Sequence, residues 1–492
     1  MTKRTRRSPT ARAWWRRGNA AQSDHPKVGP DVAADHVAAS LAGGMHRSYD
    51  VAAAARPRTR RYVSVVRKFV AALVGATVWL GVSIWISVPW IRELAARITL
   101  APALVVISLL AFVPGFVVAF LVVGLITDRQ PPLTSVTPVL ALSVLIAARN
   151  EEGAIGDTLR SLADQDYGGP LRVLLIDNGS TDGTVAAARA TARDASLALE
   201  ILSEPIAGKS HALNRGLAAT SDELVITLDA DTLLQRSAIR LLVSRLASSP
   251  PDVGAVAGAV LVRNSRSTFW SRLQTWDYFL GIASVKRMQG LFQNTLVAQG
   301  AFSLYRSAAI RDAGGWPDAI GEDIVLTWKM MNNGARIFFE PLAVAFTSAP
   351  ETFSMLARQR SRWARGMIEG LRTVPPWRHQ HGYAKVLTGF NLLIPLLDTA
   401  YVFAWLPGLV LAGFGDYWIV GPMTIAVLPV TLVVYGVLFH YQNQRVFRPL
   451  GLRVRRNLLG LFLFVVIYQL FMSSFSVLGY FQELTRRARR WK

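Results

Sequence analysis

Five long apolar runs constrain this chain most strongly, two of them before residue 130 and three after residue 385. They cover residues 69–90, 103–126, 386–411, 418–441 and 458–481. A helix that crosses a bilayer needs about 20 consecutive apolar residues. Runs of this length, almost free of charge, favour membrane spans over buried core helices. The sequence therefore predicts a multi-pass membrane protein with a large soluble segment between two sets of spans.

Positive charge is concentrated at the two ends of the chain. Residues 1–68 hold +11 and residues 441–492 hold +9 of the formal +22, so the central region is almost neutral. Nucleic-acid binding would need basic residues on the folded surface. Here the basic residues lie mostly at the two ends, so we expect no nucleic-acid partner. Residues 1–60 are rich in Arg and Ala without hydrophobic periodicity, which predicts a disordered tail rather than a signal peptide. The absence of cysteine excludes disulfides, thiolate metal sites and thiol nucleophiles.

Basic segments beside the spans indicate the topology, because such segments remain cytoplasmic. An N-terminus inside places residues 127–385 in the cytoplasm, and two further spans return the basic loop 445–456 there. A fifth span would leave the basic residues 484–492 outside, against this rule. Two alternatives remain: the last run re-enters, or one C-terminal segment lies in the membrane interface.

The soluble middle alternates apolar runs with amphipathic helical patterns. The runs at 141–148, 171–177, 199–204 and 223–231 each end in a polar cluster. Strands alternating with helices predict a mainly parallel sheet covered on both faces. Ligands of such sheets bind beyond the carboxyl ends of the strands, and we expect the functional residues there.

The stretch Gly208-Lys209-Ser210 resembles the end of a phosphate-binding loop of nucleotide triphosphatases. The first glycine of that motif is replaced by Ser203, and Pro205 removes an amide donor. The broken motif disfavours an ATPase. Lys209 nevertheless opens a predicted helix at the ligand edge, where we expect it to meet a phosphate or a neighbouring acid.

Paired carboxylates follow two of the predicted strands. Asp229 and Asp231 alternate after an apolar strand, which suits a hard divalent cation together with a diphosphate. Asp177 and Asp182 could accept hydrogen bonds from a base and ribose. The alternative for Asp182 is ordinary helix capping.

Further along, Glu322 and Asp323 precede an apolar helix, and a Trp/Arg-rich amphipathic stretch covers residues 351–372. Acids at a helix start often only complement its dipole, and a stretch of this kind is typical of an interfacial helix. Neither reading explains why Gln359, Arg362 and Trp363 fall within one and a half turns. Asp398 lies inside the third apolar run, where an acid is either functional or bonded to a neighbouring helix.

The motifs ARNEE, IDNGSTDGT, GKSHALNRG, LDADT, GAFSLYR, GEDIVLTW and QRSRW occur in this order. Together they resemble processive family 2 glycosyltransferases, most closely the bacterial poly-β-1,6-N-acetylglucosamine synthases, over roughly residues 60–480. The resemblance implies a GT-A catalytic domain, of the mainly parallel α/β class, inserted between transmembrane helices. The domains implied are a tail at 1–60, two spans in 61–130, the catalytic domain at 131–350, interfacial helices at 351–385, about three spans in 386–483, and a basic tail at 484–492.

The resemblance also implies roles at the donor end of the site. Asp177 would contact uridine, Lys209 would belong to the UDP-sugar site, and Asp229 and Asp231 would hold the Mg2+ or Mn2+ that neutralises the departing diphosphate. A glycosyl donor reacts through an oxocarbenium-like state, so stabilising the leaving group suits the chemistry. Asn178 departs from the family, which usually has a second aspartate there.

At the acceptor end, Asp323 would be the general base, with Glu322 beside it. Gln359 and Arg362 would hold the diphosphate, and the indole of Trp363 would meet the acceptor sugar. A base on the acceptor face suits displacement with inversion. The segment at 300–306 matches the family only loosely and receives no acceptor role.

The resulting expectation is an enzyme of the bacterial inner membrane that polymerises a β-linked polysaccharide from a UDP-sugar at the cytoplasmic face and extrudes it. Its partners would be the donor, a growing polysaccharide or a lipid acceptor, and the bilayer, with a small accessory subunit as a further candidate. Transfer of a single sugar to a lipid is the main alternative. A catalytically dead nucleotide sensor would be expected to lack some of the acids that are present here.

Overall fold

The computed structural model describes residues 62–134, 137–421, 423–453 and 457–486. All of these residues belong to one compact unit, Tyr49–Lys492. The tail predicted to be disordered at 1–60 lies outside the described residues, and so does most of the basic tail at 484–492.

An eight-stranded sheet with the order β3-β2-β1-β4-β7-β6-β8-β5 forms the centre of the soluble segment within the described residues. The strands are β1 (Leu142–Ala148), β2 (Leu171–Asp177), β3 (Leu199–Ser203), β4 (Leu224–Leu228), β5 (Leu233–Leu234), β6 (Val253–Val262), β7 (Phe302–Arg306) and β8 (Arg336–Thr347). Strands β3, β2, β1 and β4 are parallel, as are β6 and β8, whereas β7 is antiparallel to β4 and β6 and β5 to β8. The mainly parallel sheet is confirmed.

Helices cover both faces of this sheet, because successive side chains of its apolar strands point to opposite sides. In β1, Val144 and Ile146 join one core cluster and Leu145 joins the other. The first cluster receives side chains from α7 (Ile155–Ala163), α8 (Thr184–Asp194), α10 (Ala238–Ala247) and α11 (Phe269–Leu280). The second receives them from α9 (Lys209–Ala218), α12 (Arg287–Leu291), α13 (Ser307–Asp312) and α14 (Glu322–Asn332). The carboxyl ends of β1, β2 and β4 are thus held at one edge.

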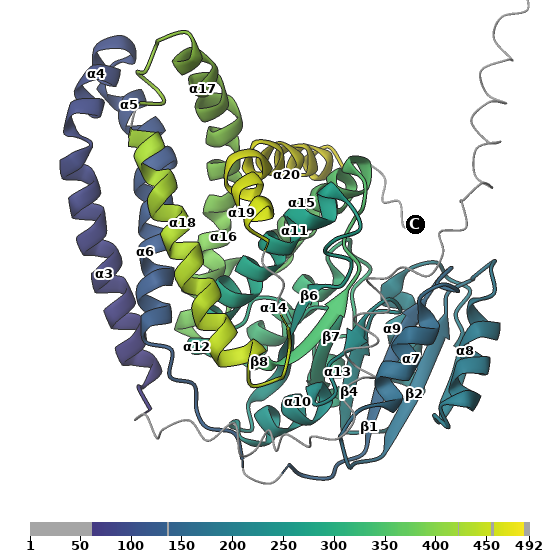
Figure 1. Ribbon diagram of the computed structural model, residues 1–492. Coiled ribbons are helices and arrows are strands. Elements are labelled where there is room, and N and C mark those ends of the chain that lie inside the picture. Colours follow the sequence, from purple (N-terminus) through teal and green to yellow (C-terminus); the bar gives the residue numbers. More distant parts are fainter. Residues whose placement is uncertain (1–61, 135–136, 422, 454–456, 487–492) are drawn as a thin grey trace, which may run out of the picture. The chain divides into compact units, whose positions relative to one another are not determined.

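Three helical segments among the described residues are long and apolar enough to cross a membrane. They are Val65–Ile86 (α3), Leu100–Ile126 (α5 through α6) and Gly382–Gly413 (α16 through α17), and they coincide with the first three predicted runs. Helix α3 packs along α6 (Figure 1). The fourth run coincides with the 20-residue helix α18, Met423–Gln442.

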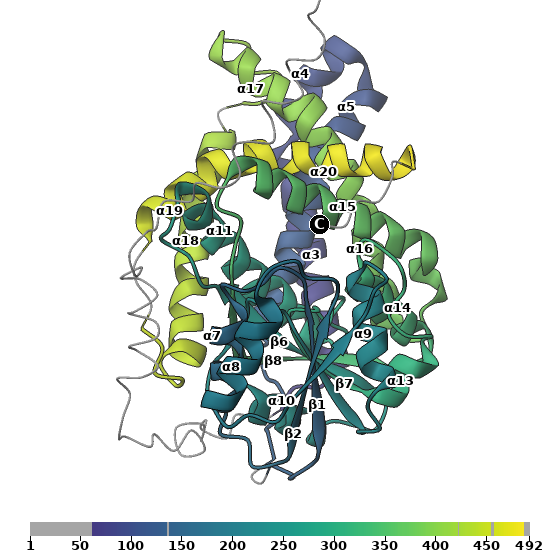
Figure 2. The same cartoon turned by 90° about the vertical axis from the view of Figure 1, so that its right-hand side faces the viewer.

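The fifth predicted run is bent rather than straight. Leu458–Tyr468 and Leu470–Leu484 meet at 51°, the geometry of a broken span or a re-entrant segment. Its second half, α20 (Gln469–Leu484), packs along α15 (Phe353–Thr373), and the two helices lie side by side in both views (Figures 1 and 2). The Ser473 and Tyr480 hydroxyls each donate to the Asp398 carboxylate at 2.7 Å. Asp398 is therefore bonded to a neighbouring helix.

Two buried ion pairs lie beside the segment that follows α6, one from α12 and one between α10 and β8. The Arg287 guanidinium lies 2.7 Å from the Asp128 carboxylate and donates to Gln442 at 3.0 Å. Arg245 pairs with Glu340 at 2.7 Å and donates to the Pro131 carbonyl at 2.8 Å.

Candidate active site

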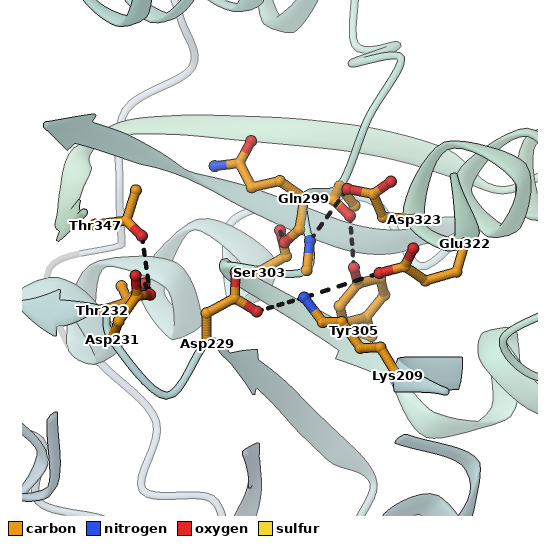
Figure 3. A network of polar contacts seen from close by, with 12 residues as sticks. Lys209, Asp229, Asp231, Thr232, Gln299, Ser303, Tyr305, Glu322, Asp323 and Thr347 are labelled. Atoms are coloured by element: carbon orange, nitrogen blue, oxygen red, sulfur yellow. Dashed lines mark hydrogen bonds and ion pairs between the residues drawn. The ribbon is translucent and has the colours of Figure 1, made fainter. Parts of the chain in front are cut away.

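Lys209 lies at the centre of the polar groups at the carboxyl edge of the sheet (Figure 3). Helix α9 begins directly after Gly208, whose φ of +148° is rarely adopted by other residues. The Lys209 ammonium forms an ion pair with Asp229 and lies 3.8 Å from the Glu322 carboxylate. Burial would lower the pKa of Lys209, but these two carboxylates outweigh it and raise the pKa. Lys209 thus meets neighbouring acids, one of its two predicted environments.

The two aspartates of the LDADT motif occupy a tight turn after β4. The turn is closed by the Thr232 amide, which donates to the Asp229 carbonyl at 3.0 Å. The Asp231 carboxylate accepts from the Thr347 hydroxyl at 3.1 Å, at the end of β8. Burial, followed by the charge of Asp229, raises the pKa of Asp231. The two carboxylates are therefore close enough to act on one ligand.

Glu151 is a third acid at this position, and our sequence reasoning did not assign it to the site. Burial and the charges of Asp231, Asp229 and Asp182 raise its pKa to about 7. The available signal was its place in ARNEE, directly beyond the end of β1. Within the part of the chain that the structure describes, no three His, Asp or Glu side chains form a metal-ligand group by themselves.

Two acids lie at the end of β2 and in the loop that follows it: Asp177 is half-buried and Asp182 is exposed. Asp177 accepts from the Ser180 amide at 3.2 Å, and Asp182 accepts from the Thr184 amide at 3.0 Å at the start of α8. Asp182 also accepts from the Glu152 amide at 3.2 Å, so it joins the loop after β1 to the start of α8. Its pKa is lowered mainly by the Thr184 hydroxyl.

Asn178 has a structural role that the sequence did not predict. The side chain is 2% exposed, and its amide donates to the carbonyls of Glu204 at 2.9 Å and Ile206 at 2.7 Å. Its carbonyl oxygen accepts from the Gly208 amide at 2.8 Å. A carboxylate could not donate the first two bonds. Asn178 thus fixes the loop that leads into Lys209.

Glu322 and Asp323 form the first turn of α14 and face the same edge. The two Asp323 carboxylate oxygens accept from the Ile324 amide at 2.8 Å and from the Gly300 amide at 3.4 Å. A Cβ at Gly300 would lie 2.9 Å from the Lys209 Nζ, so the segment before β7 borders the site. Burial raises the pKa of Glu322 to about 7, Lys209 opposes this shift, and Asp323 adds to it.

Helix α15 is fastened directly to the loop that carries this acid pair. The Glu369 carboxylate accepts from the amides of Ile320 at 2.7 Å and Gly321 at 3.2 Å. Gly321 and Gly366 touch, because a Cβ on Gly321 would lie only 2.7 Å from the Gly366 Cα. A larger residue at either position would push α15 away from α14. The two glycines therefore set the distance between the acid pair and the QRSRW segment.

The QRSRW side chains reach the site to different degrees. The Arg362 charge is close enough to Glu322 to lower the pKa of that acid. The Gln359 Oε1 atom is buried and has no hydrogen-bond partner among the described residues. Trp363 is 45% exposed. The structure thus brings Lys209, the two acid pairs and Arg362 together, whereas Asp177 lies in the adjoining loop after β2.

Comparison with known proteins agrees with this arrangement. The profile of a family described as "Glycosyltransferase like family 2" matches residues 138–366. The poly-beta-1,6-N-acetyl-D-glucosamine synthase of Staphylococcus aureus (strain MSSA476) is 32% identical over 275 residues, which are 54% of this chain and 66% of that protein. The synthase of the same name from Staphylococcus epidermidis is 34% identical over 231 residues, 47% of this chain and 55% of that protein. The matches thus span less than two thirds of either relative.

A solved structure shares the fold. It is a mannosyltransferase from Pyrobaculum calidifontis in complex with GDP-Man and Mn2+, with a TM-score of 0.53 and 21% identity, and the superposition covers 78% of this chain and 99% of that one. The profile match extends from just before β1 into α15, so it includes every strand described above. Residues 138–366 of this chain are therefore a glycosyltransferase family 2 domain with a GT-A-like fold.

Proposed function

We propose that this protein is a membrane-embedded, inverting glycosyltransferase that polymerises a β-linked, N-acetylglucosamine-containing polysaccharide from a UDP-sugar. The observation that carries the proposal is the position of Lys209, whose ammonium pairs with Asp229 and lies 3.8 Å from Glu322. It joins acids that are about ninety positions apart in the sequence at the edge where parallel sheets bind ligands. A donor diphosphate and an acceptor hydroxyl would meet there.

The acids at the donor end fit a divalent cation. Burial is the largest cause of the raised pKa values of Asp231 and Glu151, and the charge of Asp229 adds to both shifts. Oxygen ligands of this kind suit Mg2+ or Mn2+, with diphosphate oxygens completing the ligand set. Asp229 and Asp231 would hold the ion, which would supply charge neutralisation to the leaving group.

Asp323 would take the proton from the acceptor hydroxyl. The acceptor oxygen forms a bond to the anomeric carbon while the bond to UDP breaks, and the configuration inverts because the two groups occupy opposite faces. Backbone amides orient both Asp323 oxygens, so the carboxylate is held in one position. Glu322, with its pKa near 7, would share the proton that Asp323 receives.

The remaining predicted residues receive roles that match their chemistry. Lys209 and Arg362 would bind diphosphate oxygens, and Asp177 would contact the nucleoside. The orphaned Gln359 carbonyl oxygen needs a hydrogen-bond donor, which a diphosphate lacks and a sugar hydroxyl supplies. The amide nitrogen of the same side chain can donate to phosphate oxygens, so Gln359 would hold the diphosphate while a sugar hydroxyl donates to its carbonyl oxygen. Trp363 would stack on the acceptor sugar.

The polymer, rather than a single transfer, is favoured by the staphylococcal relatives, whose names describe polysaccharide synthases. The three candidate spans and the basic ends of the chain favour a bacterial inner membrane, with the catalytic domain in the cytoplasm. A product that leaves the cytoplasm would pass beside α15 and the spans. Transfer to a lipid remains the second candidate, since α15 and α20 lie against each other next to the acid pair.

Incubation of the detergent-purified protein with UDP-GlcNAc, UDP-Glc or UDP-GlcA, each with Mg2+ or Mn2+, tests the proposal through UDP release. We expect release from UDP-GlcNAc and a product longer than an oligosaccharide. One labelled glycolipid instead of polymer would support the second candidate. An absence of UDP release with all three donors, while the protein remains folded, would contradict both.

A further inference from the structure

Trp363 is held by a second arginine of its own motif, which the proposed mechanism does not use. The Arg360 guanidinium carbon lies 4.0 Å from the centroid of the Trp363 ring, so the cation covers one face of the indole. Arg360 is only 5% exposed, whereas Trp363 is 45% exposed. Since one face is covered, the exposed area of the indole belongs to the opposite face and the edge.

Arg360 is itself fixed from α11. Its guanidinium lies 2.6 Å from the Asp277 carboxylate and 5.7 Å from the centroid of the Tyr278 ring. The Tyr278 and Trp363 rings are 6.0 Å apart and tilted by 56°. A buried arginine paired with a carboxylate and packed against two rings has little rotational freedom. Its planar group therefore restricts the indole to one orientation.

This cluster borders the proposed site on two sides. The charge of Asp231 contributes to the raised pKa of Tyr278, although burial is the larger cause. On the other side, Arg362 acts on Glu322 and lies next to Trp363 in the chain. Trp363 thus follows directly after an arginine that acts on the acid pair, and its ring contacts Tyr278 in α11.

We propose that Arg360, held by Asp277 and Tyr278, is a positioning residue that presents a single free face of Trp363 to the terminal sugar of the acceptor. This inference rests on the proposed function for the identity of the ligand. It predicts that Arg360 controls acceptor binding without contacting the donor, in contrast to Arg362 two residues further along the same helix.

The test compares Arg360→Gln and Arg360→Lys with Arg358→Gln, a matched control on the exposed side of the same helix. UDP release from UDP-GlcNAc is measured with and without an added β-1,6-linked N-acetylglucosamine oligomer. We expect Arg360→Gln to raise the KM for the oligomer about tenfold or more, with the donor KM and the slow release without oligomer unchanged. Arg360→Lys retains the ion pair but not the planar stack, and should restore only part of the affinity. An equal change in donor KM and oligomer KM would overturn the inference.

A double-mutant cycle separates positioning from general packing. In a Trp363→Ala background, Arg360→Gln should change the oligomer KM less than twofold, because the residue it orients is absent. If Arg360→Gln raised the oligomer KM by the same factor in the Trp363→Ala background as in the wild type, the positioning role would be contradicted. If Arg360→Gln does not fold, Asp277→Asn replaces it with the same expected pattern. Calorimetry of oligomer binding without donor distinguishes a failure of the Arg360 proposal from a failure of the proposed function. A wild-type protein that binds the oligomer but releases no UDP would contradict the proposed function alone.

Discussion

The Lys209 ammonium and the Asp229 carboxylate form an ion pair that joins the first turn of α9 to the end of β4. The same ammonium group lies 3.8 Å from Glu322 at the start of α14. A bound diphosphate would compete with both carboxylates for this cation. Lys209 would therefore couple donor binding to the state of the acid pair.

Replacing Lys209 by Met should move the acid limb of the pH–rate profile to higher pH. The Glu322 pKa is about 7, so Glu322 takes up a proton as the pH falls through that range, and the negative charge beside the Asp323 base is lost. Lys209 lowers this pKa, so its removal should shift the limb upward by about one pH unit. The measurement is kcat at saturating UDP-GlcNAc between pH 5 and 9. The control is Lys329→Met in the last turn of α14, and an unchanged or downward-shifted limb would refute the coupling.

Replacing Asn178 by Asp should destabilise the protein, although the family that this chain resembles usually has aspartate at this position. The new carboxylate would lose two donated hydrogen bonds and would face the Glu204 and Ile206 carbonyls. Leaving such buried groups unsatisfied costs about 1–3 kcal/mol. We expect a lower melting temperature and a higher donor KM, because the loop leading to Lys209 is released. A variant as stable as the wild type would show that the loop does not depend on this amide.

Breaking the buried Arg245–Glu340 pair tests how the sheet is fastened to the segment after α6. Glu340→Gln leaves Arg245 buried without its counter-charge, which costs about 3–5 kcal/mol. Replacing both residues by Met should recover most of this loss, since buried pairs contribute little net stability. Thermal unfolding in detergent measures both variants. A double variant no more stable than Glu340→Gln would contradict the electrostatic explanation.

Asp231→Asn should remove the response of activity to Mg2+ or Mn2+. The carboxylate is one of two that would hold the ion, and loss of such electrostatic stabilisation costs about 100-fold in rate. Asp194→Asn, at the exposed end of α8, is the matched control. The measurement is UDP release against metal concentration. Wild-type turnover of Asp231→Asn at the same metal concentration would remove Asp231 from the ion site.

The sequence predicted the elements of the fold more fully than the contacts between them. Apolar runs ending in polar clusters identified β1, β2, β3 and β4, because parallel strands buried on both faces consist almost entirely of apolar residues. The same pattern placed Lys209 and Asp229 at one edge, whereas Asp323 was assigned to the site only through the resemblance to the family. The only sequence feature that indicated the bend in the last apolar run was the basic tail that follows it, because a fifth straight span would have left that tail outside.

The remaining details depend on neighbours that come from distant parts of the chain. Glu151 enters the acidic cluster only because β1 lies between β2 and β4. The roles of Asn178 and Gly321 depend on a loop and a helix that follow them by about 26 and 45 residues in the sequence. The contacts that hold Arg360 and Trp363 come from Asp277 and Tyr278 in α11, which lies more than seventy residues earlier in the sequence. Residue patterns within one segment carry no information about such partners.

The central claim is that Asp323 removes the acceptor proton at a site where the donor is already bound. The direct measurement is transfer by Asp323→Asn, together with UDP affinity determined by calorimetry on the same preparation. We predict that kcat falls about 10²- to 10⁴-fold while the Kd for UDP changes less than threefold. Full activity in Asp323→Asn, or an equal loss of transfer and of UDP binding, would contradict the assignment.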